Sequence, residues 1–422
     1  MSSAETSYDP ILKKFTARGA SSFPVAAFDH AAELEILDIS GTLSALPIGM
    51  SQFKKLRVAF FSNSNFTEVP VQLAKCPSLQ MLGMRGCKIA EWPDAALPES
   101  IRGITLTDNQ LTSVPASIGR LVNLQKLMLS GNKLHDLPRE ILRCQDLEIL
   151  RLAANNFVYE PSWLADLPAL AWYSDAGNPF CKDAVTGIDE LPEVSWQDLK
   201  VAEQIGKSAN NTVLRATLPD GRDVAVKLYG GHLSTDGLVA DEIQASTAAG
   251  IHPNLISAIA KVVDAPEHKP AIILPLIPAE FNQLGLPPNF KTLTRDVFAP
   301  GKRFSMQSIL TTLSGVAAAL AHLHDNGVQH GDLYAHNILA SDSGAPYVGD
   351  FGAASVYQPE TAPWREAIDV CAFGNLMDDL LSHSDDPRSA QFAAMFELYQ
   401  SCVQADITER PTFAELAQLL QQ

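Results

Sequence analysis

The chain has 422 residues, of which 46% are hydrophobic, and its formal net charge at pH 7 is −17. This length is enough for two or three globular domains with sizeable cores. The strong negative charge disfavours nucleic acid and anionic membranes as partners, because an acidic protein surface repels both.

Cysteines and apolar runs indicate the cellular setting. The six cysteines are scattered without metal-ligand or disulfide spacing, and the first residues lack the basic and apolar regions of a signal peptide. The most apolar runs, residues 271–279 and 316–323, are shorter than a bilayer crossing requires. We therefore expect a cytoplasmic protein without a membrane span.

A repeat of 22 or 23 residues occupies the first half of the chain. Similar blocks, with the form Leu-x-x-Leu-x-Leu, begin at Leu34, Leu56, Leu79, Ile101, Leu124, Leu147 and Leu170. Prolines recur with the same step, from Pro24 to Pro161. Each Leu-x-Leu segment predicts a short strand with apolar side chains in a shared core. The coils must stack, because one coil cannot bury its own apolar edge.

This pattern resembles the intracellular type of leucine-rich repeat over about residues 20–180. Asparagines after several strands would bond neighbouring coils, and they are Asn109, Asn132, Asn155 and Asn178. The resemblance implies an α/β solenoid of six to seven repeats with caps, which we assign to residues 1–190.

The strands of such a solenoid would present a concave face. Its central positions would be Asp38, Phe60, Gly83, Thr105, Met128, Arg151 and Ser174. An exposed Phe60 and Met128 among polar groups are typical of a protein-binding surface. We expect a protein substrate or regulator to bind there, because no nucleophile, base or metal cluster recurs in this half.

The pattern changes near residue 190, where residues 187–197 interrupt the repeat and indicate a linker. Strands are predicted at residues 199–205, 212–216 and 223–228. The first two flank Gly206-Lys-Ser-Ala-Asn-Asn211, where small residues let backbone N–H groups approach phosphates.

A lysine ends the third strand in Val224-Ala-Val-Lys227. A lysine in an apolar strand is costly to bury without a charged partner. Glu242, fifteen residues later in a helical stretch, can supply the opposite charge.

Two polar loops follow an amphipathic helix predicted over residues 305–326. Asp332 and Asn337 lie five residues apart between apolar ends, and Asp350-Phe-Gly352 begins thirteen residues after Asn337. This spacing places three oxygen-donor side chains in two consecutive β-hairpin loops. Phosphoryl transfer needs such a set, because one base orients a hydroxyl and two ligands hold Mg²⁺.

The order and spacing of these motifs resemble those of protein kinases, over about residues 196–422. Asp369-Val-Cys-Ala-Phe-Gly374 and Arg410-Pro-Thr412 resemble later blocks of the same family. The resemblance implies an α+β bilobal domain, which we assign to residues 191–422.

The resemblance also implies a role for each motif residue in ATP-dependent transfer. Asp332 would be the catalytic base, and Asn337 and Asp350 would bind Mg²⁺. Lys227, paired with Glu242, would hold the α and β phosphates of ATP. The residues expected to enclose the nucleotide are Ile205, Gly206, Val213, Ala225 and Leu339.

Three departures from the family pattern bear on control and substrate. Gly331 replaces the arginine before the catalytic aspartate, Tyr334 replaces a common lysine, and only 19 residues separate Asp350 from Asp369. Control through an arginine–phosphate pair is therefore not expected, and the kinase half should be active without activation-loop phosphorylation. A fragment lacking residues 1–190 should keep its rate on a generic substrate.

The leading hypothesis is an ATP-dependent protein kinase, with serine or threonine rather than tyrosine as acceptor. One alternative is a kinase-like small-molecule phosphotransferase, which His330-Gly-Asp332 and the short segment would suit. Another is a catalytically weak scaffold, which Ser208 and Asn211 in place of two glycines of the kinase phosphate-binding loop would suit.

Overall fold

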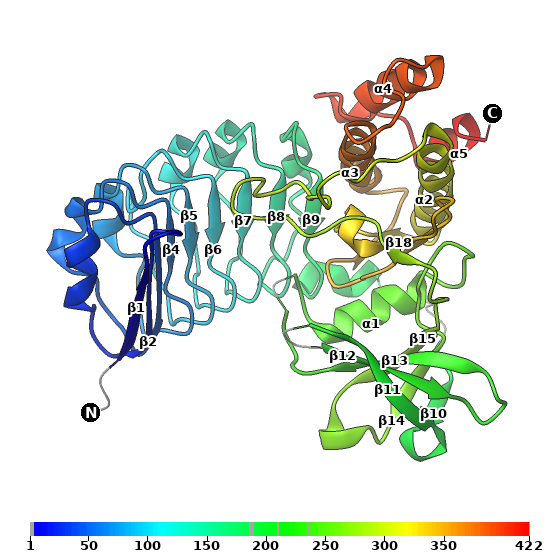
Figure 1. Ribbon diagram of the computed structural model, residues 1–422, viewed down its shortest axis with the longest axis horizontal. Helices are drawn as coiled ribbons and strands as arrows, with labels where there is room; N and C mark the ends of the chain where they lie inside the picture. Colours follow the sequence, from blue (N-terminus) through cyan, green and yellow to red (C-terminus); the bar gives the residue numbers. More distant parts are fainter. Residues whose placement is uncertain (1–3, 185–189, 209–210, 235, 422) are drawn as a thin grey trace. The chain divides into compact units, whose positions relative to one another are not determined.

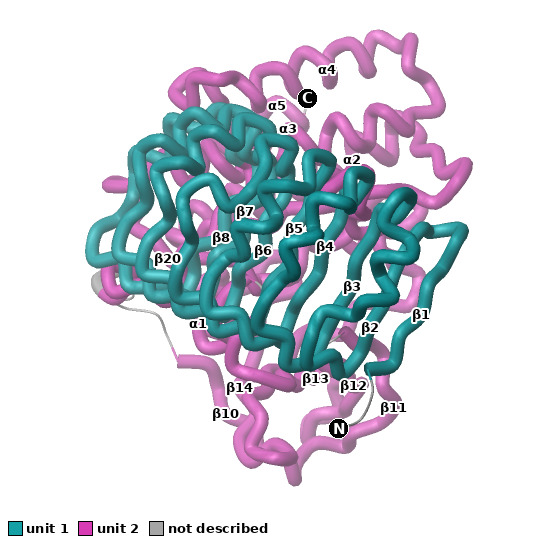
Figure 2. Tube along the Cα trace, turned by 90° about the vertical axis from the view of Figure 1, so that its left-hand side faces the viewer, with its two compact units in different colours: residues 1–170 teal, residues 171–422 magenta. Residues whose placement is uncertain are grey.

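The computed structural model describes residues 4–184, 190–208, 211–234 and 236–421. The chain forms two compact units, Met1–Leu170 and Ala171–Gln422, which Figure 2 draws in teal and magenta. Residues 171–184, which we expected to belong with the repeats, are therefore part of the second unit.

The first unit contains eight strands that follow one another in a single sheet (Figure 1). The first two strands pair antiparallel, and the later ones pair in parallel in chain order. Paired residues such as Lys126 and Ile149 differ by one period of the repeat. The strands are β1 (Glu5–Asp9), β2 (Lys14–Ala20), β3 (Ile36–Gly41), β4 (Val58–Phe60), β5 (Met81–Gly83), β6 (Gly103–Thr105), β7 (Lys126–Met128) and β8 (Ile149–Arg151).

Short 3-10 helices lie between most of these strands, and each begins directly after one of the periodic prolines. Proline suits this place because its φ is already near that of a helix and it lacks an N–H that would go unbonded. The 3-10 helices are η1 (Val25–His30), η2 (Ile48–Gln52), η3 (Val71–Lys75), η4 (Ala116–Arg120), η5 (Arg139–Arg143) and η6 (Ser162–Asp166).

Buried asparagines connect successive coils, as the repeat predicts. The side-chain amide of Asn132 donates to the carbonyls of Leu106 and Leu129, each at 2.9 Å, and its oxygen accepts from the N–H of Leu111 at 3.0 Å. Asn109 and Asn155 make equivalent bonds. These bonds satisfy backbone groups that would otherwise be buried without partners. The predicted strands are thus confirmed, whereas the leucine-rich-repeat assignment stays a prediction.

The expected exposed face is wrong at several positions. Met128 and Arg151 are buried, and Phe60 is half-buried because its ring covers the Cα of Gly83 on the next strand. Ser174 belongs to the second unit, where its hydroxyl donates to the carbonyl of Asp236 at 2.9 Å.

The second unit opens with β9 (Trp172–Ser174) and η7 (Pro179–Ala184), and a six-stranded sheet follows. In this sheet Val224, Val226 and Ile273 share one apolar core, which explains the alternation in the sequence. The strand order is β10 (Glu193–Ser195), β14 (Ala260–Val263), β15 (Ala271–Pro275), β13 (Asp223–Tyr229), β12 (Asn211–Thr217) and β11 (Lys200–Lys207).

The linker expected at residues 187–197 is only partly a linker. Residues 187–189 lie outside the described part of the chain. Residues 193–195 form β10, which pairs in parallel with β14, and η8 (Trp196–Asp198) follows. Val194 and Trp196 pack against the core of the sheet, and this burial explains why the segment is ordered.

Helices form the other lobe of this unit, while α1 (Val239–Ala248) lies with the sheet (Figure 1). Helix α2 (Met306–Asp325) begins at Ser305, whose hydroxyl accepts from the N–H of Ser308, and Gly327 follows it with φ +65°. The predicted helix over residues 305–326 is therefore confirmed. The other helices are α3 (Trp364–Leu381), α4 (Ala390–Cys402) and α5 (Phe413–Leu419).

Short strands frame the two polar loops. Strand β17 (Val328–Gln329) pairs with β20 (Ser355–Val356), and β18 (Ile338–Ala340) pairs with β16 (Asn282–Gln283) and β19 (Pro346–Val348). Asp332 and Asn337 lie between β17 and β18, and Asp350 follows β19.

In the part of the chain that the structure describes, one helix is long and apolar enough to cross a membrane. This helix is α2, and half of its most apolar window is buried inside the protein. Its residues Leu313, Val316 and Leu320 are fully buried, as in the core helix of a globular domain. The apolar run at residues 316–323 is shorter than α2 because polar residues such as Thr312 and Ser314 precede it in the helix.

Candidate active site

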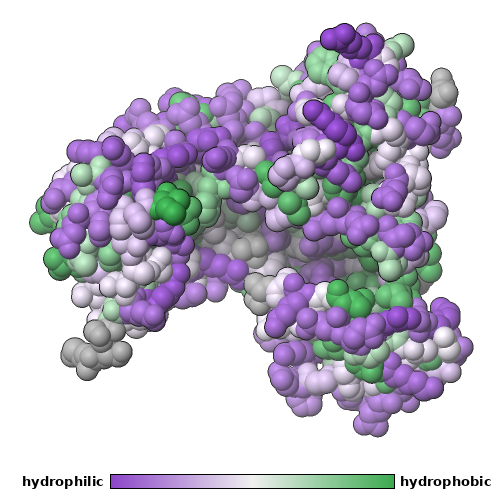
Figure 3. Space-filling view, in the orientation of Figure 1, coloured by the Kyte–Doolittle hydropathy of each residue, from purple (hydrophilic) through white to green (hydrophobic). Residues whose placement is uncertain are grey.

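An apolar cavity of about 830 Å³ lies between the six-stranded sheet and the start of the helical lobe. Four of the residues expected to enclose a nucleotide line it: Ile205, Val213, Ala225 and Leu339. In Figure 3 hydrophobic side chains gather on the lobe that contains this sheet. The volume and apolar lining suit a flat aromatic base.

The hairpin of β11 and β12 covers the cavity. Gly206 pairs with Val213, and a Cβ at Gly206 would lie 3.3 Å from the Cβ of Val213. Ala209 and Asn210 of the predicted phosphate loop lie outside the described residues. The residues on either side of them are Ser208 and Asn211, which stand where the family has glycine. The N–H of Asn211 donates to Ser208 Oγ at 3.1 Å.

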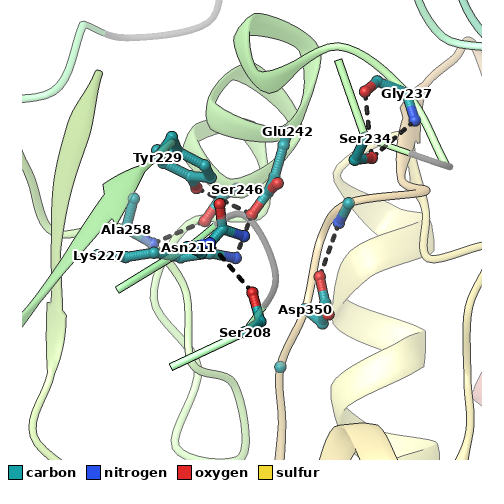
Figure 4. A network of polar contacts seen from close by, with 12 residues as sticks. Ser208, Asn211, Lys227, Tyr229, Ser234, Gly237, Glu242, Ser246, Ala258 and Asp350 are labelled. Atoms are coloured by element: carbon teal, nitrogen blue, oxygen red, sulfur yellow. Dashed lines mark hydrogen bonds and ion pairs between the residues drawn. The ribbon is translucent and has the colours of Figure 1, made fainter. Parts of the chain in front are cut away.

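Lys227 and Glu242 form the predicted ion pair (Figure 4). The Nζ of Lys227 lies 2.5 Å from Glu242 Oε1, and the two side chains are 14% and 8% exposed. The hydroxyl of Tyr229, which our sequence analysis missed, donates to the same oxygen at 2.8 Å. Tyr229 therefore helps the lysine to hold Glu242 on helix α1.

Burial alone would lower the pKa of Lys227, but the charges of Asp350 and Glu242 outweigh burial and raise it. The lysine is thus held as a cation in the cleft. Burial raises the pKa of Glu242, and Lys227 opposes that shift. A protonated, nearly buried cation beside an apolar cavity is suited to hold phosphate oxygens.

Asp350 lies across the cleft from Lys227, and it adopts a left-handed backbone conformation with φ +63°. Its Oδ1 accepts from the N–H of Gly352 at 3.1 Å. The surrounding protein tends to raise the pKa of Asp350, but the positive charge of Lys227 and the Gly352 bond lower it. The carboxylate is therefore ionised, and its side chain remains exposed.

The loop between β17 and β18, which we call the catalytic loop after its expected role, brings Asp332 and Asn337 together. The amide nitrogen of Asn337 donates to Asp332 Oδ2 at 2.7 Å and to the Asp332 carbonyl at 2.9 Å. The N–H of Gly349 donates to the carbonyl of Asn337 at 3.0 Å, which ties this loop to the one that carries Asp350. The structure thus brings all three predicted polar residues to one region.

Asp369 anchors the loop from helix α3, where it is completely buried. It accepts from the N–H groups of His330 and Gly331 at 2.7 and 3.0 Å. The Nε2 of His324 lies 3.1 Å from the same carboxylate. The sequence pointed to Asp369 only through resemblance. The physical signal is an aspartate within an apolar helix face, which must find buried donors.

His336 and Asp296 form a pair that the sequence analysis missed. The Nδ1 of His336 lies 2.7 Å from Asp296 Oδ1, and its backbone N–H donates to Asp296 Oδ2 at 2.9 Å. Burial alone would lower the pKa of His336, but Asp296 raises it, with smaller contributions from Asp332 and Asp350. The sequence analysis could not pair His336 with Asp296, because the two residues are 40 positions apart and no periodic pattern links them.

The oxygen donors around the loops fit magnesium. The carboxylate of Asp350 and the amide of Asn337 are hard ligands, and Mg²⁺ takes few protein ligands when phosphates complete its shell. Over residues 4–184, 190–208, 211–234 and 236–421 there is no group of three or more His, Cys, Asp or Glu side chains that could hold a metal alone.

Comparison with known proteins finds a similarity to protein kinases within the second unit. Residues 199–372 match the family model described as the protein kinase domain. The chain is 28% identical over 206 residues to "Cysteine-rich receptor-like protein kinase 2" of Arabidopsis thaliana. This match covers 47% of this chain and 28% of that protein. The chain is 27% identical over 203 residues to "Probable serine/threonine-protein kinase kinY" of Dictyostelium discoideum, which covers 45% and 33%. The chain thus spans about a quarter to a third of the length of these relatives.

Proposed function

We propose that this chain, whose residues 199–372 form a protein kinase domain, transfers the γ-phosphate of ATP to serine or threonine hydroxyls of proteins. One observation carries the proposal. Val213, which lines the apolar cavity, pairs across β12 and β13 with Lys227, the partner of Glu242 in the ion pair. Asp350 lies close enough to Lys227 for its charge to raise the lysine pKa. A base pocket, a phosphate-binding cation and an ionised carboxylate thus adjoin one another.

Each residue has a task that follows from its surroundings. Lys227 holds the nucleotide phosphates, and Glu242 with Tyr229 fixes the direction of the lysine. Asp350 and Asn337 are the residues that would hold Mg²⁺, which neutralises phosphate charge when bound. Asp332, oriented by Asn337, accepts the proton of the acceptor hydroxyl. A base in this position contributes roughly 10²–10⁴-fold to a rate.

The first unit is proposed to be a leucine-rich-repeat module that binds a protein substrate or regulator. Its parallel sheet and its buried asparagines support this proposal. Three of the positions expected on the concave face are partly exposed, and they are Asp38, Phe60 and Thr105. The net charge of −17 over the whole chain favours a cytoplasmic location away from anionic lipid.

A small-molecule acceptor is the second candidate, and the short segment between Gly352 and helix α3 favours it. Only β20 and a turn separate Gly352 from helix α3, which begins at Trp364. A short segment leaves little surface for an extended peptide. The relatives named as serine/threonine kinases favour a protein acceptor.

A radiolabelled ATP assay tests these candidates with the full chain. Protein extracts and small alcohols, including aminoglycosides, serve as separate acceptors, and Asp332→Asn is the control for contaminating kinases. Label on protein serine or threonine supports the proposal. Label on small alcohols alone supports the second candidate, and no label above the control on either contradicts both.

A further inference from the structure

Strand β9, at the start of the second unit, packs directly on the catalytic loop. The indole ring of Trp172 stacks on the ring of Tyr334, with centroids 4.4 Å apart and planes 4° from parallel. The indole Nε1–H donates to the carbonyl of Leu333 at 2.9 Å. Leu333 and Tyr334 directly follow Asp332, so this strand contacts the backbone that orients the catalytic base.

The same strand explains the glycine before Asp332. Gly331 has φ +70°, and a Cβ there would collide with the carbonyl oxygens of Tyr173 and Ala353. Tyr173 belongs to β9, and Ala353 directly follows the Asp350-Phe-Gly352 motif. The arginine that related kinases have at this position therefore has no room here, because β9 occupies the space above the loop.

An ion pair fixes β9 to the beginning of helix α3. The guanidinium of Arg365 makes two bonds to the carboxylate of Asp175, at 3.0 and 2.6 Å. The two side chains are only 2% and 1% exposed. The hydroxyl of Tyr173 donates to Asp175 Oδ2 at 2.8 Å, so the carboxylate has further support.

The ion pair also reaches the strand that leads into the catalytic loop. Arg365 donates to Gln329 Oε1 at 3.0 Å, and Gln329 directly precedes His330. The guanidinium carbon lies 4.9 Å from the ring centroid of Trp364 and 5.7 Å from that of Tyr357. A buried charged pair with such geometry has few alternative arrangements, because either partner alone would be an uncompensated buried charge.

We propose that Asp175 is a positioning residue for phosphoryl transfer, and this inference rests on the proposed kinase function. Phosphorylation orders a kinase loop by giving an arginine an anion to hold. Here Asp175 supplies a permanent anion to Arg365, and the network through Gln329, Trp172 and Gly331 sets the loop that carries Asp332. The loop is thereby fixed without a phosphate.

The test compares Asp175→Asn with wild type in the full chain. The amide has the same shape but lacks the charge. We expect kcat to fall at least tenfold while KM for ATP changes less than twofold, because the nucleotide cavity is built from other residues. Rates are divided by the concentration of folded sites, measured by titration with a fluorescent ATP analogue. Asp175→Glu, which keeps the charge, should recover part of kcat.

Two further variants separate positioning from simple stability. Leu416→Ala removes buried side-chain atoms in helix α5 and is matched to Asp175→Asn by its loss in Tm. We expect its kcat per folded site to equal that of wild type. Trp172→Phe keeps an aromatic ring but loses the bond to Leu333, and it should reduce kcat severalfold at an almost unchanged Tm.

Hydrogen exchange provides a readout that does not depend on kinase activity. In Asp175→Asn the amides of residues 329–334 should exchange at least tenfold faster, while those of helix α5 remain unchanged. Unchanged exchange in residues 329–334 would overturn the positioning role, as would equal kcat per folded site in Asp175→Asn and Leu416→Ala. Faster exchange in a protein without phosphotransferase activity would overturn the proposed kinase function alone. A rate that falls after phosphatase treatment of wild type would contradict the proposal that Asp175 fixes the loop without a phosphate.

Discussion

The apolar cavity and the loop that carries Asp332 are the two halves of the proposed active site, and the chain builds them in different ways. The cavity is lined mainly by one sheet and the segment that follows it, and the nearby Lys227–Glu242 ion pair joins residues 15 positions apart. The loop is held by Asp369, 39 positions from His330, and by the Asp175–Arg365 pair, 190 positions apart. Local apolar alternation makes the cavity, whereas distant buried charges make the loop.

The sharpest way to separate the two halves is Asp332→Asn. Phosphoryl transfer should fall at least a hundredfold, because the amide cannot accept the acceptor proton, and a positioned base contributes roughly 10²–10⁴-fold. ATP affinity should stay within twofold, since Asp332 does not line the cavity. Initial rates and calorimetric ATP binding check both statements. If the variant keeps more than a few per cent of the wild-type rate, Asp332 is not the catalytic base.

Asp350→Ala should abolish the stabilisation of the protein by Mg²⁺–ATP, because Asp350 is the expected metal ligand between the cavity and the catalytic loop. At 100 times Kd, a ligand stabilises the folded state by roughly 2.7 kcal/mol, which raises Tm by about 5–10 °C for a unit of this size. We expect this Mg²⁺–ATP shift for wild type and almost none for the variant. Repeating the melts in EDTA is the control, and equal shifts in the two proteins would show that Asp350 does not bind the metal–nucleotide complex.

Two fragments test whether the loop needs β9. Fragment 171–422 keeps the strand, and fragment 191–422 loses it together with Asp175. We expect the first to retain the full-length rate on a generic peptide and the second to lose at least tenfold, contrary to the expectation from the sequence for removal of residues 1–190. Circular dichroism verifies that each fragment is folded. Equal rates in two folded fragments would show that the loop is independent of β9.

Glu242→Gln examines the cavity side alone. Without the carboxylate charge, Lys227 loses its main restraint, and we expect kcat/KM for ATP to fall about tenfold, equivalent to ~1.4 kcal/mol. Tyr229→Phe removes only the hydroxyl bond to Glu242 and should cost less than threefold. Steady-state kinetics at varied ATP measures both. A larger loss in Tyr229→Phe than in Glu242→Gln would reverse the assigned importance of the two contacts.

The smallest expected effect is a pH dependence from His336, which lies on the loop side. Its pKa is raised above the ordinary value of 6.5, because Asp296, Asp332 and Asp350 outweigh the effect of burial. The stabilisation is therefore complete below about pH 6.5 and is lost as pH rises through the raised pKa. The Tm difference between wild type and His336→Gln should shrink over that window. A difference that grows with pH would contradict the raised pKa.

The sequence predicted four of the residues that line the cavity, because they lie in or beside short apolar segments with a local signal. Val213 and Ala225 lie in neighbouring predicted strands, and Glu242 follows Lys227 by fifteen residues in a predicted helix. It also located Asp332, Asn337 and Asp350 through motif spacing. The role of these residues in catalysis stays a prediction that the experiments above address.

The contacts that hold the loop were not predictable in the same way. Asp175 lies after a strand that fits the repeat pattern, so its sequence indicated only another coil. Arg365 lies between Asp350 and Asp369, where the sequence showed only a segment shorter than that of the kinase family. Two charges far apart in the chain leave no periodic signal, and only the fold shows that each neutralises the other.

The Asp175–Arg365 pair has a consequence for how the protein is made. Contacts over 161 and 190 residues, from Trp172 to Leu333 and from Asp175 to Arg365, close late because chain entropy opposes distant pairing. Synthesis proceeds from the N-terminus, so Asp175 leaves the ribosome long before Arg365 exists. A nascent chain can therefore complete its first unit while its catalytic loop still lacks an anchor. Phosphate transfer would begin only once translation has passed helix α3.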